Sequence, residues 1–304
     1  MPHVLTGIRF LSGGFGWAWG AAGLYATAGS GLTWHALALP APVRVRGRLV
    51  FASFTDSTHG WVALGWLPCA TQGCSIAIFQ TRDGGATWTP VAHNLTLGST
   101  SSGGPKPSLG WLTFEDGGYL GAGRGWLVSD TPSGSVWITT DGGRRWTSRV
   151  TLEQGGTNTA AAFAGDGHGW AAGRTGASSS TLFATGDRGA NWRRLGVVPG
   201  VIYALSAAPD GGSAWALVGL SREPCAWGQA VCGHSVAVAS ATGVGAVVRA
   251  PRGDTLHALA ALSTRRAWAV ATGPWSGTAL LKTTDGGRDW VLRYRSGLTT
   301  RAGS

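Results

Sequence analysis

Four aspartates recur in one eight-residue pattern, T-x-D-x-G-x-x-W, which could mark either a repeated catalytic acid or a repeated turn. The octets are TRDGGATW (81–88), TTDGGRRW (139–146), TGDRGANW (185–192) and TTDGGRDW (283–290), and they contain Asp83, Asp141, Asp187 and Asp285. A carboxylate can act as a general acid, a general base or a nucleophile. One that recurs beside Gly in a short polar stretch is typical of a turn, where it accepts hydrogen bonds from backbone N–H groups. We therefore predict a structural role for these four aspartates.

Two carboxylates outside the octets, Glu223 and Asp130, are the remaining catalytic candidates. Glycosidases need two carboxylates facing each other across the scissile bond. These two belong to different repeat units, so the sequence does not pair them. The sequence has no Walker loop, no H-E-x-x-H and no G-x-S-x-G, and we predict no metal site and no cofactor.

Three tryptophans and three arginines are the candidate binding residues. Trp66, Trp227 and Trp275 stand apart from the repeated tryptophan positions and could stack on sugars or anchor a protein, or else pack under their own loops. The segment VRVRGRLV (43–50) alternates arginine with apolar residues, so a strand would project Arg44, Arg46 and Arg48 to one side. There they could bind a carboxylate or phosphate, or form a solvated strand edge.

Four cysteines occur as two close pairs, Cys69 with Cys74 and Cys225 with Cys232. Neither pair has zinc-ligand spacing, and His234 is the single histidine near them, whereas tetrahedral zinc would need two further ligands. We predict two local disulfides, which are typical of proteins outside the reducing cytosol. The first twenty residues lack the features of a secretory signal, so an extracytoplasmic location requires a targeting segment not present in this chain or another export route.

The elements that position these residues repeat along the sequence. An apolar stretch with Trp after a tight turn occurs six times, at Trp17, Trp61, Trp126, Trp170, Trp215 and Trp268. Strand-rich repeats of 40 to 50 residues are typical of propeller blades. The composition, with 51 Gly, 17 Trp and 12% charged residues, agrees with a turn-dense β-protein.

Each repeat divides into four short strands, which we name A to D. In the fourth unit the strands are predicted at 157–164, 169–174, 180–185 and 192–198, and in the sixth at 256–263, 266–273, 279–284 and 290–295. The octet lies between strands C and D. The units are 4–40, 44–95, 108–152, 157–199, 200–250 and 254–296. The first octet, TAGSGLTW, has Gly29 in place of Asp, and the fifth is eroded to SATGVGAV. We predict a single all-β domain, a six-bladed β-propeller of four-stranded antiparallel blades, with seven blades as the alternative.

The octets match the Asp-box, or BNR, repeat, and the whole sequence resembles the sialidase-like Asp-box propellers. With a GW-containing strand before each box, it is most similar to bacterial BNR-repeat proteins that include the photosystem II assembly factor family. That family is usually seven-bladed, whereas this protein has six units. A sialidase resemblance would imply an arginine triad, a Tyr nucleophile paired with Glu and an Asp acid, but the sequence has only four tyrosines and no R-I-P motif near its start. Such folds host hydrolases, binding proteins and assembly factors.

Up-and-down blades place the A–B and C–D turns on one rim, the turn rim, and the B–C loops and D–A links on the other, the loop rim. The octet aspartates are predicted on the turn rim, together with five A–B turn carboxylates, Asp56, Glu115, Asp116, Asp166 and Asp210. Two cysteine-containing B–C loops, 64–74 and 220–232, belong to the second and fifth units, which oppose each other in a six-bladed ring. The loop rim is therefore the predicted functional face.

The predicted function is a non-enzymatic extracytoplasmic binding or assembly module that binds a protein or carbohydrate partner through the loop rim. The alternatives are a secreted glycoside hydrolase of sialidase-like type and a spacer domain in a larger assembly. The formal net charge of +10 comes almost wholly from arginine; it could mark a polyanionic partner or a coding bias, and we expect no nucleic acid. No apolar run of 18 or more residues predicts a membrane span.

Overall fold

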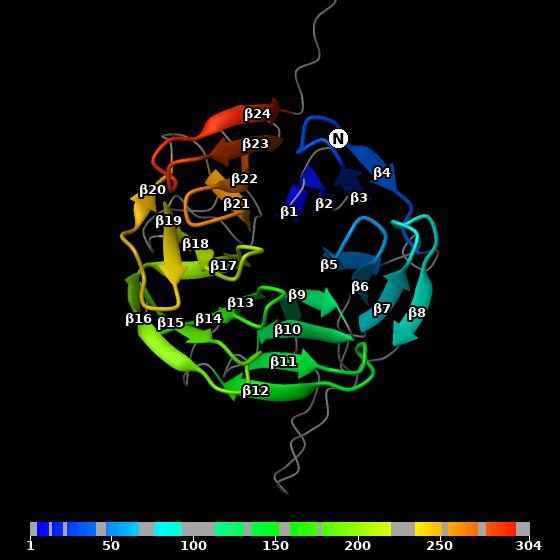
Figure 1. The fold of residues 1–304 in the computed structure, drawn as a ribbon, viewed down its shortest axis with the longest axis horizontal. Helices are drawn as coiled ribbons and strands as arrows, with labels where there is room; N and C mark the ends of the chain where they lie inside the picture. Colours follow the sequence, from blue (N-terminus) through cyan, green and yellow to red (C-terminus); the bar gives the residue numbers. More distant parts are fainter. Residues whose placement is uncertain are drawn as a thin grey trace, which may run out of the picture.

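The fold is a ring of six small sheets. The computed structural model describes residues 5–11, 14–20, 23–40, 47–66, 76–92, 113–121, 123–130, 135–151, 159–175, 178–219, 235–250, 255–272 and 278–295. These residues form six four-stranded antiparallel sheets arranged around a central axis (Figure 1). The prediction of an all-β, six-bladed β-propeller is confirmed, and the described residues do not form the seven-bladed alternative. Within these ranges we find no helix suited to crossing a membrane.

The first three blades cover the N-terminal half of the protein. Blade 1 consists of β1 (Leu5–Phe10), β2 (Gly16–Gly20), β3 (Gly23–Thr27) and β4 (His35–Leu37). Blade 2 consists of β5 (Gly47–Phe54), β6 (Gly60–Trp66), β7 (Ile76–Thr81) and β8 (Thr89–Ala92). Blade 3 consists of β9 (Thr113–Gly121), β10 (Arg124–Asp130), β11 (Ser135–Thr139) and β12 (Thr147–Thr151).

Among the last three blades, blades 4 and 6 agree with the strands predicted for the fourth and sixth units to within two residues at each end. Blade 4 consists of β13 (Thr159–Phe163), β14 (Gly169–Arg174), β15 (Ser179–Thr185) and β16 (Arg193–Pro199). Blade 5 consists of β17 (Val201–Ala207), β18 (Ser213–Gly219), β19 (Ser235–Ser240) and β20 (Val248–Arg249). Blade 6 consists of β21 (Thr255–Ala261), β22 (Ala267–Thr272), β23 (Thr278–Thr283) and β24 (Val291–Arg295).

The placement of Glu115 and Asp116 in an A–B turn was wrong. Both residues lie within β9, where Asp116 pairs with Val128 and Glu115 falls at an irregularity in the register. The D-G-G sequence 116–118 lies within the strand, and a Cβ on Gly117 would lie 2.5 Å from the Phe51 ring of the neighbouring blade. The glycine thus allows two inner strands to approach closely.

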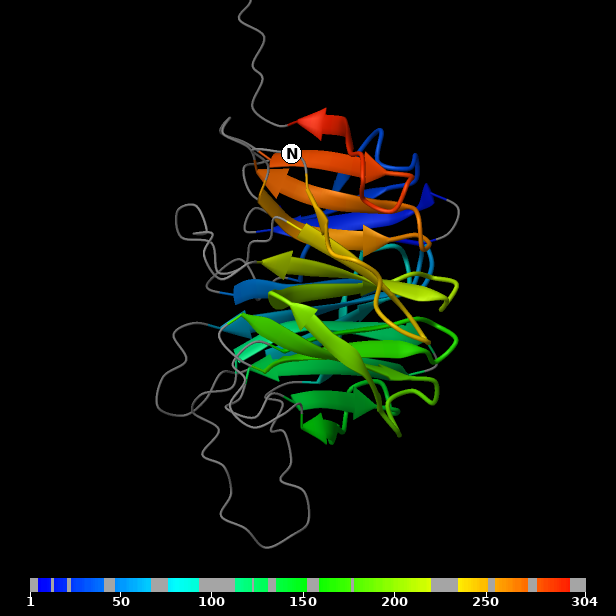
Figure 2. The same cartoon turned by 90° about the vertical axis from the view of Figure 1, so that its left-hand side faces the viewer.

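The first strand of each blade, strand A, lies nearest the axis, and the fourth lies at the outside (Figure 1). Every sheet contains four consecutive strands, so the ring closes by the packing of β1 against β21 and β22 and not by a shared sheet. Phe10 of β1 stacks on Trp268 of β22 at this closure, with ring centroids 5.2 Å apart. The A–B and C–D turns lie together along one edge of the ring (Figure 2).

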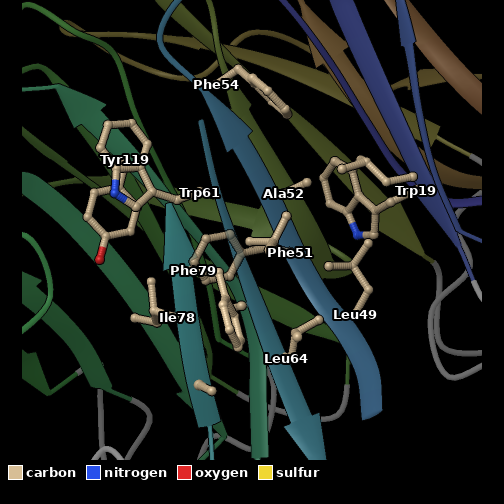
Figure 3. Close-up of a cluster of buried hydrophobic side chains, with 14 of the residues drawn as sticks. Trp19, Leu49, Phe51, Ala52, Phe54, Trp61, Leu64, Ile78, Phe79 and Tyr119 are labelled. Carbon is tan, nitrogen blue, oxygen red and sulfur yellow. The ribbon is translucent and has the colours of Figure 1, made fainter. Parts of the chain in front are cut away.

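Blades 1 to 4 each pack on the preceding blade through an aromatic residue at the end of strand A, which contacts the strand B tryptophan of that blade. Besides the closing pair, these contacts are Phe54 on Trp17, Tyr119 on Trp61 and Phe163 on Trp126. The rings of Trp61 and Tyr119 lie nearly parallel with centroids 4.5 Å apart (Figure 3). The strand B tryptophans are almost fully buried, so they form the apolar contact between neighbouring sheets.

Candidate functional site

The four octet aspartates lie in the C–D turns, where their carboxylates bind the turn itself. In each octet the threonine hydroxyl donates to the aspartate, and the N–H of the octet's fifth residue donates to that hydroxyl oxygen. The carboxylate also accepts an N–H from the seventh residue, as from Arg145 to Asp141 at 2.9 Å. Each of these carboxylates is therefore hydrogen-bonded within its own turn.

These hydrogen bonds keep the aspartates ionised. The hydroxyl and N–H of Thr87 lower the pKa of Asp83 to about 2, and the N–H and amide of Asn191 lower the pKa of Asp187 to about 2. Burial acts to raise the pKa of Asp141, but the Arg145 N–H and Thr139 hydroxyl outweigh it, so the pKa lies below its ordinary value. A proton donor in catalysis needs the opposite shift, so these groups fit a structural role.

The octet turns are tied to the A–B turns of the same blades. The N–H of Gly142 donates to the Gly123 carbonyl at 2.7 Å, and the same bond recurs in blades 1, 2, 4 and 6. The octet glycine packs inward: a Cβ on Gly143 would lie 2.2 Å from the Tyr119 hydroxyl, and its φ of +96° favours glycine. In each of these blades the two turns are thereby joined to each other.

Of the residues predicted on the loop rim, the structure gives the backbone position of three. Trp66 and Asp130 are the last residues of β6 and β10, at the loop-rim ends of these strands, and Arg48 is the second residue of β5. The remaining candidates, Glu223, Trp227, Trp275, Arg44, Arg46, Cys69, Cys74, Cys225 and Cys232, lie outside the described residues. The roles predicted for all of these residues remain predictions.

The described residues instead form a central cavity of about 200 Å³ at the turn rim. All six blades contribute the ends of their inner strands or the turns that follow, including Arg9, Phe54, Tyr119, Phe163 and Ala261. The lining is mostly aromatic and aliphatic, with Ser53 and Ser206 among its few polar groups. A concave surface that combines aromatic rings with a few polar groups can bind a ligand.

Arg9 is the cation of this cavity. Its guanidinium carbon lies 5.3 Å from the centre of the Trp126 ring and 6.0 Å from that of Trp19, within the range of cation–π attraction. Arg9 belongs to blade 1 and Trp126 to blade 3, so the side chain reaches across the ring. Gly118 leaves room for it, because a Cβ there would lie 3.2 Å from Arg9 Nη1.

The cavity is suited to binding. Among the described residues that line it there is no carboxylate, and its one phenol, Tyr119, donates to the Gly142 carbonyl. Burial, reinforced by the charge of Asp141, raises the pKa of Tyr119, so this phenol stays neutral. The part of the protein that the structure describes also contains no group of three or more potential metal ligands.

Sequence reasoning did not identify Arg9. Nothing in the segment IRF distinguishes Arg9 from a surface residue, because its position depends on Gly118 in blade 3, more than one hundred residues later. Arg188 was also overlooked, although the sequence contained a signal. The octet TGDRGANW has Arg188 where the other three octets have Gly84, Gly142 and Gly286.

Comparisons with known proteins support the fold. No protein-family model matches the sequence, and no curated protein matches it. A structure of YCF48 bound to a D1 peptide is 20% identical, with a TM-score of 0.54, covering 95% of this chain and 81% of that one. YCF48 from Cyanidioschyzon merolae is 18% identical, with a TM-score of 0.55, covering 96% and 86%.

An enzyme has a similar architecture. The GH74 enzyme of Niastella koreensis is 15% identical, with a TM-score of 0.61, and the match covers 95% of this chain but only 45% of the enzyme. At these identities the similarity shows the β-propeller fold alone. The class of protein is thus a β-propeller whose solved neighbours include both peptide-bound and hydrolytic members.

Proposed function

We propose that this protein is a non-enzymatic, extracytoplasmic Asp-box propeller that binds a polypeptide partner as a binding or assembly module. The observation that carries the proposal is the central cavity, in which Arg9 lies against two indole rings within an aromatic and aliphatic wall. Arginine and aromatic side chains dominate the binding energy of protein interfaces. The cysteine pairs in the sequence support the extracytoplasmic location.

The neighbouring structure of YCF48 with a D1 peptide supports a polypeptide as the partner class. The loop rim, with Trp66, Trp227 and Trp275, is the second surface through which the partner, protein or carbohydrate, could bind. The two rims lie at opposite ends of the blade strands (Figure 2), so substitutions on one rim leave the other rim intact.

The test is a selection of peptides from a random display library on the purified full-length protein, followed by titration of the enriched peptides. We expect Arg9→Gln to weaken their binding and Arg145→Gln, an exposed arginine of the turn rim, to leave it unchanged. Loss of binding in Trp66→Ala with Trp227→Ala instead would place the site on the loop rim. Absence of any enriched peptide, together with binding on a glycan array, would reject the polypeptide assignment.

A glycoside hydrolase is the second candidate, because the GH74 enzyme of Niastella koreensis and an arabinanase of Penicillium chrysogenum have similar architectures. This function predicts turnover of a fluorogenic glycoside that disappears in Glu223→Gln or Asp130→Asn. A broad glycoside panel with no turnover would reject it. The intact mass before and after reduction tests the predicted disulfides separately.

A further inference from the structure

A second cavity adjoins the central one on the turn rim, between blades 3 and 4. It has a volume of about 160 Å³ and shares Leu120 and Phe163 with the central cavity. Its apolar surface comes from these residues and Ile138, and two arginines, Arg124 and Arg188, also line it. The volume is similar to that of an apolar cavity of about 150 Å³ that holds a benzene molecule, so one aliphatic or aromatic side chain fits.

Arg188 occupies a backbone position that disfavours it. Its φ is +63°, in the left-handed region, and the equivalent residues of the other Asp-containing octets are glycines with φ between +72° and +86°. A bulky residue in this region costs free energy that glycine does not. The backbone hydrogen bond is the same as in the other octets, since the Arg188 N–H donates to the Gly167 carbonyl at 2.9 Å. The turn therefore gains nothing from the arginine.

The guanidinium group of Arg188 is not bound by the described part of the fold either. It is exposed, and its stem lies over Gly167, where a Cβ would be 2.9 Å from Arg188 Cγ. Within the described ranges, neither Arg124 nor Arg188 has an ion pair or a side-chain hydrogen bond. A strained residue whose charged group has no partner among the described residues is a candidate for function.

The third charged residue of this cavity is Asp187. Its carboxylate accepts hydrogen bonds from the Thr185 hydroxyl and from the N–H and side-chain amide of Asn191. This carboxylate is thus held in its own turn, and the two guanidinium groups remain as the donors available to a ligand. Guanidinium groups bind carboxylates through paired hydrogen bonds.

We infer that this cavity binds a carboxylate of a partner polypeptide together with a neighbouring apolar side chain. Arg124 and Arg188 hold the carboxylate, and the apolar side chain enters between Leu120, Ile138 and Phe163. The carboxylate is either the terminal carboxylate of the partner or an Asp or Glu side chain. The inference deepens the proposed function and rests on it, since a peptide bound in the central cavity would continue directly into this one.

The probes are three acetylated tripeptides and inorganic phosphate, titrated into the full-length protein by calorimetry. Ac-Gly-Gly-Leu with a free carboxyl terminus tests a terminal carboxylate, its amide is the control, and Ac-Gly-Glu-Leu amide tests an internal carboxylate. We expect one or both of the acids to bind and the amide without Glu not to bind. Arg188→Gly and Arg124→Gln should each weaken binding about tenfold or more, the loss expected for a charged hydrogen bond.

Stability supplies an independent readout. Because glycine relieves the strain, Arg188→Gly should raise Tm by about 2 °C while it weakens binding. The matched control is Gly286→Arg, which introduces the strained arginine into the blade 6 octet and should lower Tm without changing peptide binding. A fall in Tm for Arg188→Gly would show that the side chain serves the fold, and would overturn the inference.

Other outcomes also contradict the inference. Peptide binding that survives both Arg188→Gly and Arg124→Gln but is lost in Arg9→Gln would reject this site and leave the proposed function standing. Binding of phosphate with no binding of either acid would assign the site to a phosphate. If neither the tripeptides nor library-selected peptides bind at all, both the inference and the proposed function fail.

Discussion

Blades 1 to 4 and blades 5 to 6 solve the same packing problem with different residues. In blades 1 to 4 an aromatic residue near the end of strand A lies directly opposite a glycine of strand B, as Phe163 lies opposite Gly169. In blades 5 and 6 both partners are alanines, Ala207 with Ala214 and Ala261 with Ala267. The sequence shows this as GW in four repeats and AW in two.

The difference has a steric cause. A Cβ on Gly169 would lie 2.4 Å from the Phe163 ring, so glycine is required wherever an aromatic ring lies across from it. Where the inner strand ends in alanine, the facing position accepts alanine. Trp170, which faces blade 5, is buried, and its indole N–H has no hydrogen-bond partner among the described residues.

The same difference between the blades appears in the lining of the central cavity. Blades 1 to 4 line it with rings, including Phe54 and Phe163, whereas blades 5 and 6 contribute Ser206, Ala207 and Ala261. The cavity is therefore asymmetric, with its cation and its aromatic surface on one side. A partner would pack its apolar groups against the aromatic side.

The largest expected effect is the loss of one inter-blade ring. Phe54 is buried and packs against Trp17, Phe15 and Trp88. Phe54→Ala should lower the free energy of unfolding by about 3–5 kcal/mol, as large-to-small core substitutions do. The matched control in blade 5, Ala207→Gly, should lower it by only about 0.5–1 kcal/mol. Urea unfolding measures both, and equal losses would show that the two kinds of blade do not differ.

The next largest effect comes from filling the glycine position. Gly169→Ala should lower the free energy of unfolding by about 1–3 kcal/mol, because the added Cβ collides with Phe163. The double variant with Phe163→Ala converts blade 4 to the blade 5 arrangement, so its loss should be smaller than the sum of the single losses. Strictly additive losses in the same urea titrations would contradict the steric explanation.

The parts of the fold and of the candidate site that the sequence predicts are those that repeat along it. The six blades, their strands and the turn aspartates followed from spacing, because the strand B tryptophan recurs in all six units and the complete octet in four. The alanine pairs were also visible in the AW repeats, although their effect on packing required the register. The reach of Arg9 to Trp126 could not be predicted, because it depends on Gly118 in another blade. Local pattern also misled at Glu115 and Asp116, where tertiary packing kept a turn-like sequence in a strand.

A smaller effect is expected from removing one turn carboxylate. Asp141→Ala removes the acceptor for the Thr139 hydroxyl and the Arg145 N–H, which should lower the free energy of unfolding by about 1 kcal/mol at this solvent-accessible turn. The turn of blade 1 indicates why the loss is small. It has Gly29 in place of Asp, and its Thr27 hydroxyl still accepts the N–H groups of Gly29 and Gly31. Peptide affinity should not change, and a loss of affinity at normal stability would contradict the structural role.

The smallest effect per residue is one of pH, and it separates the octets with aspartate from those without. Hydrogen bonds lower the folded-state pKa of Asp83 and Asp187 to about 2, against about 3.9 in an unfolded polypeptide. Their contribution to stability is therefore complete above about pH 4 and is lost as the pH falls through about 2. Tm should decline over this window, and more gently in the double variant Asp83→Asn with Asp187→Asn. An amide cannot be protonated here, so parallel Tm profiles for the variant and the parent would show that other carboxylates cause the decline. In that case the aspartates would not make their octets more sensitive to acid than the octets of blades 1 and 5, which lack the aspartate.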